Sequence, residues 1–190
     1  MIFYDHIFEW IIFGLVLLFF IYGMIAIREE RDAYLDTAIP MSFGPFSLPI
    51  PSWWTKTSAE DDESVFVFER TDTRYEWYAE FLDMGVTDQS LIELTRIDME
   101  KHDIILDQKE IRISEACHLF TNEKIIANVE DFIRLEGTGT KESKDRIYLD
   151  YVLFRLKDKT TIMARSQSSV LNGVLEGPYF EEVLKNAKFS

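Results

Sequence analysis

The sequence predicts an α+β domain behind a single N-terminal transmembrane helix. Residues 10–27 contain no charged side chain. Several later segments alternate apolar and polar residues as antiparallel strands do, and two others place apolar residues at helical spacing. We therefore divide the chain into a short tail (1–9), a transmembrane helix (10–27), a juxtamembrane stalk with a Pro-rich linker (28–45) and a soluble domain (46–190), in which helices pack on an antiparallel sheet.

The apolar stretch has the length and composition of a membrane span. Its eighteen residues would form a helix of roughly 27 Å, close to the ~30 Å hydrocarbon core of a bilayer. The twelve Leu, Ile, Phe and Val residues in it favour insertion by a total on the order of 4 to 7 kcal/mol. The residues expected to form the membrane anchor are Trp10, Gly14, Phe19, Phe20, Tyr22, Gly23 and Ile27.

Three other interpretations of this stretch fit less well. A buried helix of a soluble domain would keep a polar stripe, which this one lacks. A cleaved signal peptide would begin with basic residues, whereas Asp5 and Glu9 are acidic. No cysteine lies nearby to carry a lipid anchor. We therefore expect the helix to stay attached and to cross the lipid bilayer once.

The distribution of charge limits the partners and the orientation. The net charge is −14, and most of it lies after the span, which disfavours nucleic acid and anionic lipid headgroups and favours a cationic protein surface. Arg28 and Arg31 follow the span while no Lys or Arg precedes it, so the positive-inside rule predicts a cytoplasmic domain. The bias is only two residues, interleaved with acidic ones, and an exported or periplasmic domain is the alternative.

The first part of the domain is expected to be mostly extended. Residues 28–37 should continue the helix as a stalk until Pro40, and the Pro-rich residues that follow should form a linker that becomes an edge strand at 46–50. Trp53 and Trp54 come next, either as core and rim residues or as a binding platform. The acidic run of Glu60, Asp61, Asp62 and Glu63 lacks calcium-loop spacing and is expected to be a solvated turn. Together with the two tryptophans, these four residues form a possible partner surface.

Residues 64–70 and 75–83 should form a hairpin whose inner face carries Phe66, Phe68, Trp77, Ala79 and Phe81. A helix is expected over 89–101, capped at Thr87–Asp88, with Leu91, Ile92, Leu94 and Ile97 facing inward. Strands are expected at 104–106 and 109–113.

The second half of the domain is expected to contain a long hairpin and a final helix. Residues 125–135 have both helical spacing and strand character, and we interpret them mainly as strand leading to a hairpin loop at Gly137–Gly139. Residues 146–156 and 160–166 predict the long hairpin. A last helix should open at Gly177–Pro178, with Tyr179, Phe180, Val183 and Leu184 buried.

Several of these pieces together resemble the PsbP-like superfamily, which includes DcrB-like domains. They are the phrase from Phe46 to Trp53, the helix after Gly85, the hairpin over 146–166 and the ending Gly177 to Leu184. The ambiguous residues 125–135 and the membrane span depart from the pattern. The resemblance implies non-catalytic work, in which a domain binds or stabilises a larger protein assembly, and it brings no catalytic residues with it.

The residues themselves show no sign of an enzyme. His6, His102 and His118 lie far apart, so no metal-ligand set and no cofactor are expected. Cys117 and His118 are adjacent, and on a strand they would point to opposite faces, with the cysteine buried. We therefore expect a non-catalytic, membrane-anchored accessory or assembly subunit that contacts integral membrane subunits. A membrane-anchored sensor or small-ligand binding domain is the alternative.

Overall fold

The computed structural model describes residues 5–59, 64–70, 77–107 and 115–189, and it divides the chain into two compact units, 1–38 and 39–190. The first contains one long helix, α1 (Asp5–Thr37). Helix α1 includes the predicted span and, as expected, continues through residues 28–37 before Pro40. The second unit is the α+β domain. The expected strand at 109–113 and the acidic run at 60–63 lie outside the described residues.

A seven-stranded antiparallel sheet forms the centre of the domain, in the order β3-β4-β5-β9-β8-β7-β6. Its strands are β3 (Trp54–Lys56), β4 (Val65–Arg70), β5 (Trp77–Val86), β6 (Ile104–Leu106), β7 (Val129–Lys141), β8 (Asp145–Leu156) and β9 (Thr160–Ser169). The predicted pairing of β4 with β5 and the hairpin of β8 and β9 are confirmed. An antiparallel sheet with helices packed on it is the fold class that the sequence predicts.

A smaller sheet follows the long helix. It has three strands in the order β1-β2-β10, namely β1 (Ile39–Phe43), β2 (Phe46–Ile50) and β10 (Lys188–Phe189). Residues 39–45, which we expected to be a linker, form β1 and the turn to β2. The prediction that 46–50 is an edge strand is wrong, because both β1 and β10 pair with β2.

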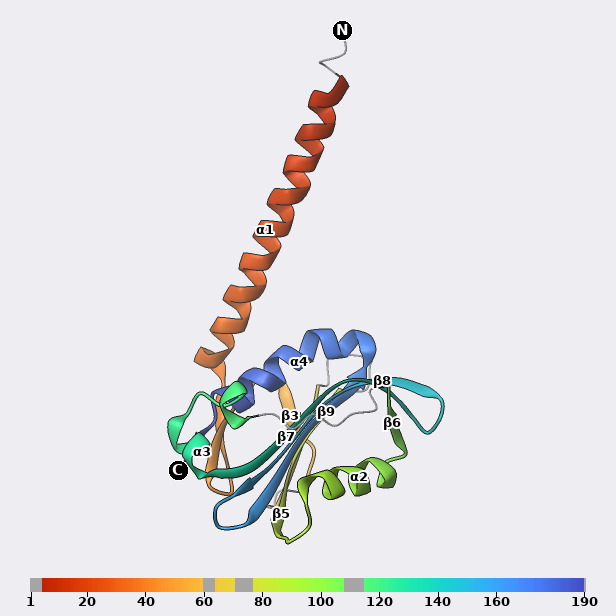
Figure 1. The fold of residues 1–190 in the computed structure, drawn as a ribbon. Coiled ribbons are helices and arrows are strands. Elements are labelled where there is room, and N and C mark those ends of the chain that lie inside the picture. The colour runs from red at the N-terminus through yellow and green to blue at the C-terminus, as the bar shows by residue number, and fades with distance from the viewer. Residues whose placement is uncertain (1–4, 60–63, 71–76, 108–114, 190) are drawn as a thin grey trace. The chain divides into compact units, whose positions relative to one another are not determined.

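The two larger domain helices cover opposite faces of the large sheet (Figure 1). Helix α4 (Val170–Lys185) packs over an aromatic core that contains Phe66, Phe68, Trp77, Phe81 and Phe180. Helix α2 (Leu91–Lys101) packs over a second core on the other face, formed with odd-numbered residues of β8. The alternation of β5 and β8 therefore supplies two cores from one sheet.

Helix α2 begins at a different residue and buries a different set of side chains from those that we expected. Its N-cap is Ser90, whose hydroxyl accepts a hydrogen bond from the Glu93 amide at 3.2 Å. Leu91 and Leu94 are buried as predicted, but Ile92 and Ile97 are exposed. The inward stripe is completed by Thr95 and Met99 instead, because those positions follow Leu91 by four and eight residues along one helical face.

Residues 125–135 divide between two elements. The first residues belong to the short helix α3 (Glu123–Asn128), capped by Asn122, and the strand β7 starts at Val129. The predicted hairpin loop at Gly137–Gly139 is wrong, because β7 continues to Lys141. A β-carbon on Gly139 would lie only 2.7 Å from the Ile105 carbonyl oxygen, so glycine here permits the close approach of β6.

Helix α4 starts seven residues before the predicted Gly177–Pro178 opening and contains Pro178 in its interior. Phe180, Val183 and Leu184 are buried as predicted, and Tyr179 is half-buried. The first turn of α4 packs closely on β8. A β-carbon on Gly173 would lie 2.6 Å from Tyr148 Cβ and closer still to two of its ring carbons.

We expect Gly173→Ala to lower the free energy of unfolding by about 2 to 3 kcal/mol, since the added methyl must displace the rigid root of the Tyr148 side chain. The matched control is Gly177→Ala, one turn later, where the nearest Tyr148 atom would be 3.6 Å away. That substitution should be neutral or stabilising by up to about 1 kcal/mol. Urea unfolding followed by tryptophan fluorescence measures both, and equal effects would show that Gly173 is not needed for the packing of α4.

Candidate functional site

The apolar helix is the first candidate. Among the described residues, one helix is long and apolar enough to cross a membrane, over Phe8–Ala26, with a mean hydropathy of 2.2. Trp10, Phe19, Phe20 and Tyr22 are exposed, and a β-carbon on either Gly14 or Gly23 would meet no atom within 4 Å. Arg28 is exposed as well, while the side chains of Ile27 and Arg31 lie outside the described ones. The segment fits a membrane anchor or a signal peptide.

The predicted partner surface at Trp53 and Trp54 is not formed as a pair of exposed rings. Trp54 is buried against Phe68 and Trp77. Trp53 is half-buried, and its ring lies edge-to-face on Tyr179 at 5.1 Å. The two rings are therefore core and rim: Trp54 begins β3 and enters the core, whereas Trp53 lies in the turn before the strand.

A buried glutamate holds Trp54 in place. Glu176 of α4 is 2% exposed. Its carboxylate accepts a hydrogen bond from Trp54 Nε1 at 3.1 Å and pairs with the Arg70 guanidinium. The side chain joins α4 to β3 and β4, and both of its oxygens are occupied by protein donors.

A second buried network lies between α2 and the sheet. Arg165 of β9 is 2% exposed and donates to Asp98 at 3.0 Å and to Glu80. Nε2 of His102 lies 3.4 Å from Arg165 Nη2. Burial, followed by the charge of Arg165, lowers the pKa of His102 below its usual value. The pairing of one cation with two carboxylates ties α2 to the strands beneath it.

A third network joins α4 to the opposite face of the sheet. Arg134 of β7 makes a two-point contact with Asp150 of β8, at 3.1 and 2.9 Å, and also donates to Glu181 of α4 at 2.9 Å. Burial raises the pKa of Asp150 to about 6, although Arg134 opposes the shift. Sequence reasoning missed all three networks. A basic residue inside an otherwise apolar strand, as at 134 and 165, was the signal for two of them.

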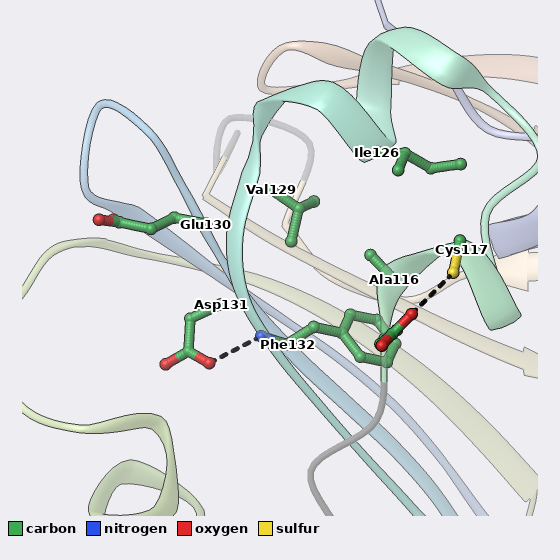
Figure 2. Close-up of a pocket in the computed structure, with 8 residues that line it drawn as sticks. Ala116, Cys117, Ile126, Val129, Glu130, Asp131 and Phe132 are labelled. Carbon is green, nitrogen blue, oxygen red and sulfur yellow. Dashed lines mark hydrogen bonds between the residues drawn. The ribbon is translucent and has the colours of Figure 1, made fainter.

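A cavity of about 350 Å³ opens between the start of β7 and the segment before α3 (Figure 2). Apolar side chains from Ala116, Ile126, Val129 and Phe132 line it, together with Glu115, Cys117, Glu130 and Asp131. Figure 2 shows Glu130 and Asp131 on one side of β7, and Ile126 and Cys117 on the other. Both oxygens of Glu130 accept hydrogen bonds from Lys159 Nζ at 2.6 Å. The open part of the cavity is thus mostly apolar.

Cys117 lies at the mouth of this cavity, in a place that the sequence did not predict. It belongs to the 3-10 turn η1 (Ala116–His118), and both Cys117 and His118 are exposed. Our expectation of a buried cysteine on a strand is therefore wrong. The thiol donates to Glu115 Oε2 at 3.4 Å (dashed at Cys117 in Figure 2).

The chemistry of Cys117 does not suit a nucleophile. The hydrogen bond to Glu115, together with partial desolvation and the carboxylate's charge, raises the pKa of the thiol. A nucleophilic cysteine needs a lowered pKa, from a cation or a base beside it. One donor atom each from Glu115, Cys117 and His118 does lie within 4.8 Å of the other two, so these residues could hold a metal ion.

Comparison with known proteins identifies the fold. No protein-family model matches this chain, and no curated protein matches it. The solution structure of cyanobacterial PsbP (CyanoP) from Synechocystis matches with a TM-score of 0.51 at 12% identity, over 80% of this chain and 91% of that one. The crystal structure of PA94 from Pseudomonas aeruginosa, a protein of unknown function, matches with a TM-score of 0.44 at 9% identity, over 78% and 94%. The domain has the PsbP-like fold, which confirms the resemblance seen in the sequence.

Proposed function

We propose that this protein is a single-pass, membrane-anchored accessory or assembly subunit that docks to a larger membrane protein complex and has no catalytic role of its own. The observation that carries the proposal is the joining of an apolar helix of membrane-spanning length, none of whose span is buried, to a PsbP-like domain. A retained helix of this kind holds the domain at the bilayer, where its neighbours are integral membrane subunits.

The character of the domain supports this function. The arginines at 70, 134 and 165 pair with carboxylates inside the fold. The chain as a whole has a net charge of −14. Its surface therefore attracts a cationic protein partner and repels nucleic acid. A negatively charged surface of this kind suits docking beside larger subunits.

Extraction in a mild detergent followed by native electrophoresis tests the proposal. The full-length protein should co-migrate with a large assembly, and the mature polypeptide should retain residues before Arg28. Migration as a free monomer, or a mature N-terminus downstream of Arg28, would contradict the proposal. Migration as a free monomer, together with a ligand-dependent rise in melting temperature, would favour the alternative, a membrane-anchored ligand-binding domain. The 350 Å³ cavity is the feature that supports this alternative.

The side of the membrane can be read from a natural probe. Arg28 and Arg31 favour a cytoplasmic domain, and Cys117 is both exposed and the single cysteine of the chain. A membrane-impermeant maleimide, used with EDTA, should therefore label Cys117 in inside-out vesicles and not in right-side-out ones. The Cys117→Ser variant gives the background. The opposite pattern would place the domain on the exported side.

A further inference from the structure

Three chemically different metal-ligand types meet at the turn η1. One donor atom each from Glu115, Cys117 and His118 lies within 4.8 Å of the other two, and all three residues are exposed. The turn is fixed to the domain directly after them, because Leu119 and Phe120 are buried and Phe120 packs on Phe132 and Phe154. The donors therefore project from an anchored piece of backbone.

The spacing is close to what a tetrahedral zinc ion requires. Zinc bonds of about 2.0 to 2.3 Å place neighbouring ligand atoms roughly 3.3 to 3.7 Å apart. Cys117 Sγ and Glu115 Oε2 are already 3.4 Å apart. A donor nitrogen of the exposed His118 ring lies within 4.8 Å of Cys117 Sγ and of a carboxylate oxygen of Glu115.

We propose that Glu115, Cys117 and His118 bind one Zn²⁺ ion, with a water in the fourth position. A thiolate, an imidazole and a carboxylate are the ligand types that zinc takes, and three protein ligands with one open position are a known arrangement. The cavity beside Glu115 and Cys117 leaves room for the water. The 3-10 turn, and not a strand, brings the cysteine and the histidine to one side. The site is independent of the proposed docking function.

Cobalt spectroscopy tests the site directly. The full-length protein in mild detergent, reduced, free of chelator and without a histidine tag, is titrated with Co²⁺. We expect a thiolate-to-cobalt band in the near ultraviolet and tetrahedral ligand-field bands in the visible, saturating at one ion per chain and lost when Zn²⁺ is added. The Cys117→Ser variant should lose the near-ultraviolet band.

Zinc affinity, measured by competition with a chromophoric chelator, provides the second readout. Because even outer-shell changes cost 10- to 100-fold in affinity, His118→Gln and Glu115→Gln should each weaken binding by about tenfold or more. Glu123→Gln, an exposed acidic residue nearby on α3, is the matched control and should bind as the wild type does.

We also expect bound Zn²⁺ to slow the alkylation of Cys117. This measurement needs no variant, so it does not depend on whether a variant folds. The absence of a thiolate-to-cobalt band, an alkylation rate that Zn²⁺ leaves unchanged, or a His118→Gln variant that binds zinc as tightly as Glu123→Gln would each overturn the assignment.

Discussion

Replacing Arg165 with methionine is expected to lower the free energy of unfolding of the domain by about 3 to 5 kcal/mol. Methionine keeps the apolar stem of the side chain but removes the charge. Glu80 and Asp98 then face each other without the cation that neutralises them, at positions where their side chains are only 19% and 12% exposed. Glu80 is then left without its cation, and among the described residues Asp98 keeps only the half-buried His102 ring, whose Nε2 lies 3.5 Å from Oδ1. Mostly buried carboxylates that lose their arginine cost far more than the contact itself contributes.

Two further variants separate this cause from general damage to the core. Arg96→Met removes an arginine of α2 that is 60% exposed and pairs with Glu93, and it should cost less than about 1 kcal/mol. Combining Arg165→Met with Glu80→Gln and Asp98→Asn should restore much of the lost stability, since an uncharged replacement of a whole network is often tolerated. Chemical denaturation in mild detergent measures all of them. If Arg165→Met cost no more than Arg96→Met, the network would not be what holds α2.

Local patterns in the sequence were enough to predict the elements that are stabilised by their own residues. The uncharged stretch predicts its helix, and the alternation of β8 and β9 around the polar turn at 157–159 predicts that hairpin, which the structure confirms. The face that carries Phe66, Phe68 and Phe81 was also readable from period-two alternation. In each of these segments the local preference and the tertiary environment agree.

The errors lie where a contact from a distant strand overrides local preference. Gly173, Gly177 and Pro178 are typical helix breakers, yet α4 includes all three, and Tyr148 of β8 fills the space beside Gly173. Gly139 is typical of a turn, yet it lies inside β7 where β6 approaches. Arg165 pairs with Asp98 and Glu80, which lie 67 and 85 residues away in the sequence. No local pattern around Arg165 shows which carboxylates it pairs with.

Substitutions in the apolar helix give the largest expected change. The span favours insertion by a total on the order of 4 to 7 kcal/mol, and an arginine at the centre of a span costs about 2.5 to 3.5 kcal/mol. Leu17 and Leu18 lie near the middle of Phe8–Ala26. Changing both to arginine should therefore cancel the preference for the bilayer, because the added cost of about 5 to 7 kcal/mol matches the whole of the original gain.

Carbonate extraction of membranes measures the result. The wild type should stay in the pellet, and the Leu17→Arg, Leu18→Arg variant should move to the supernatant. The control carries two arginines on the same helix but beyond the span, Ala33→Arg and Leu35→Arg, at positions that are exposed, and it should pellet as the wild type does. Because the control adds the same charge, release of the first variant alone is attributable to the hydrocarbon core. Retention of both variants in the pellet would mean that contacts other than the apolar helix hold the protein at the membrane.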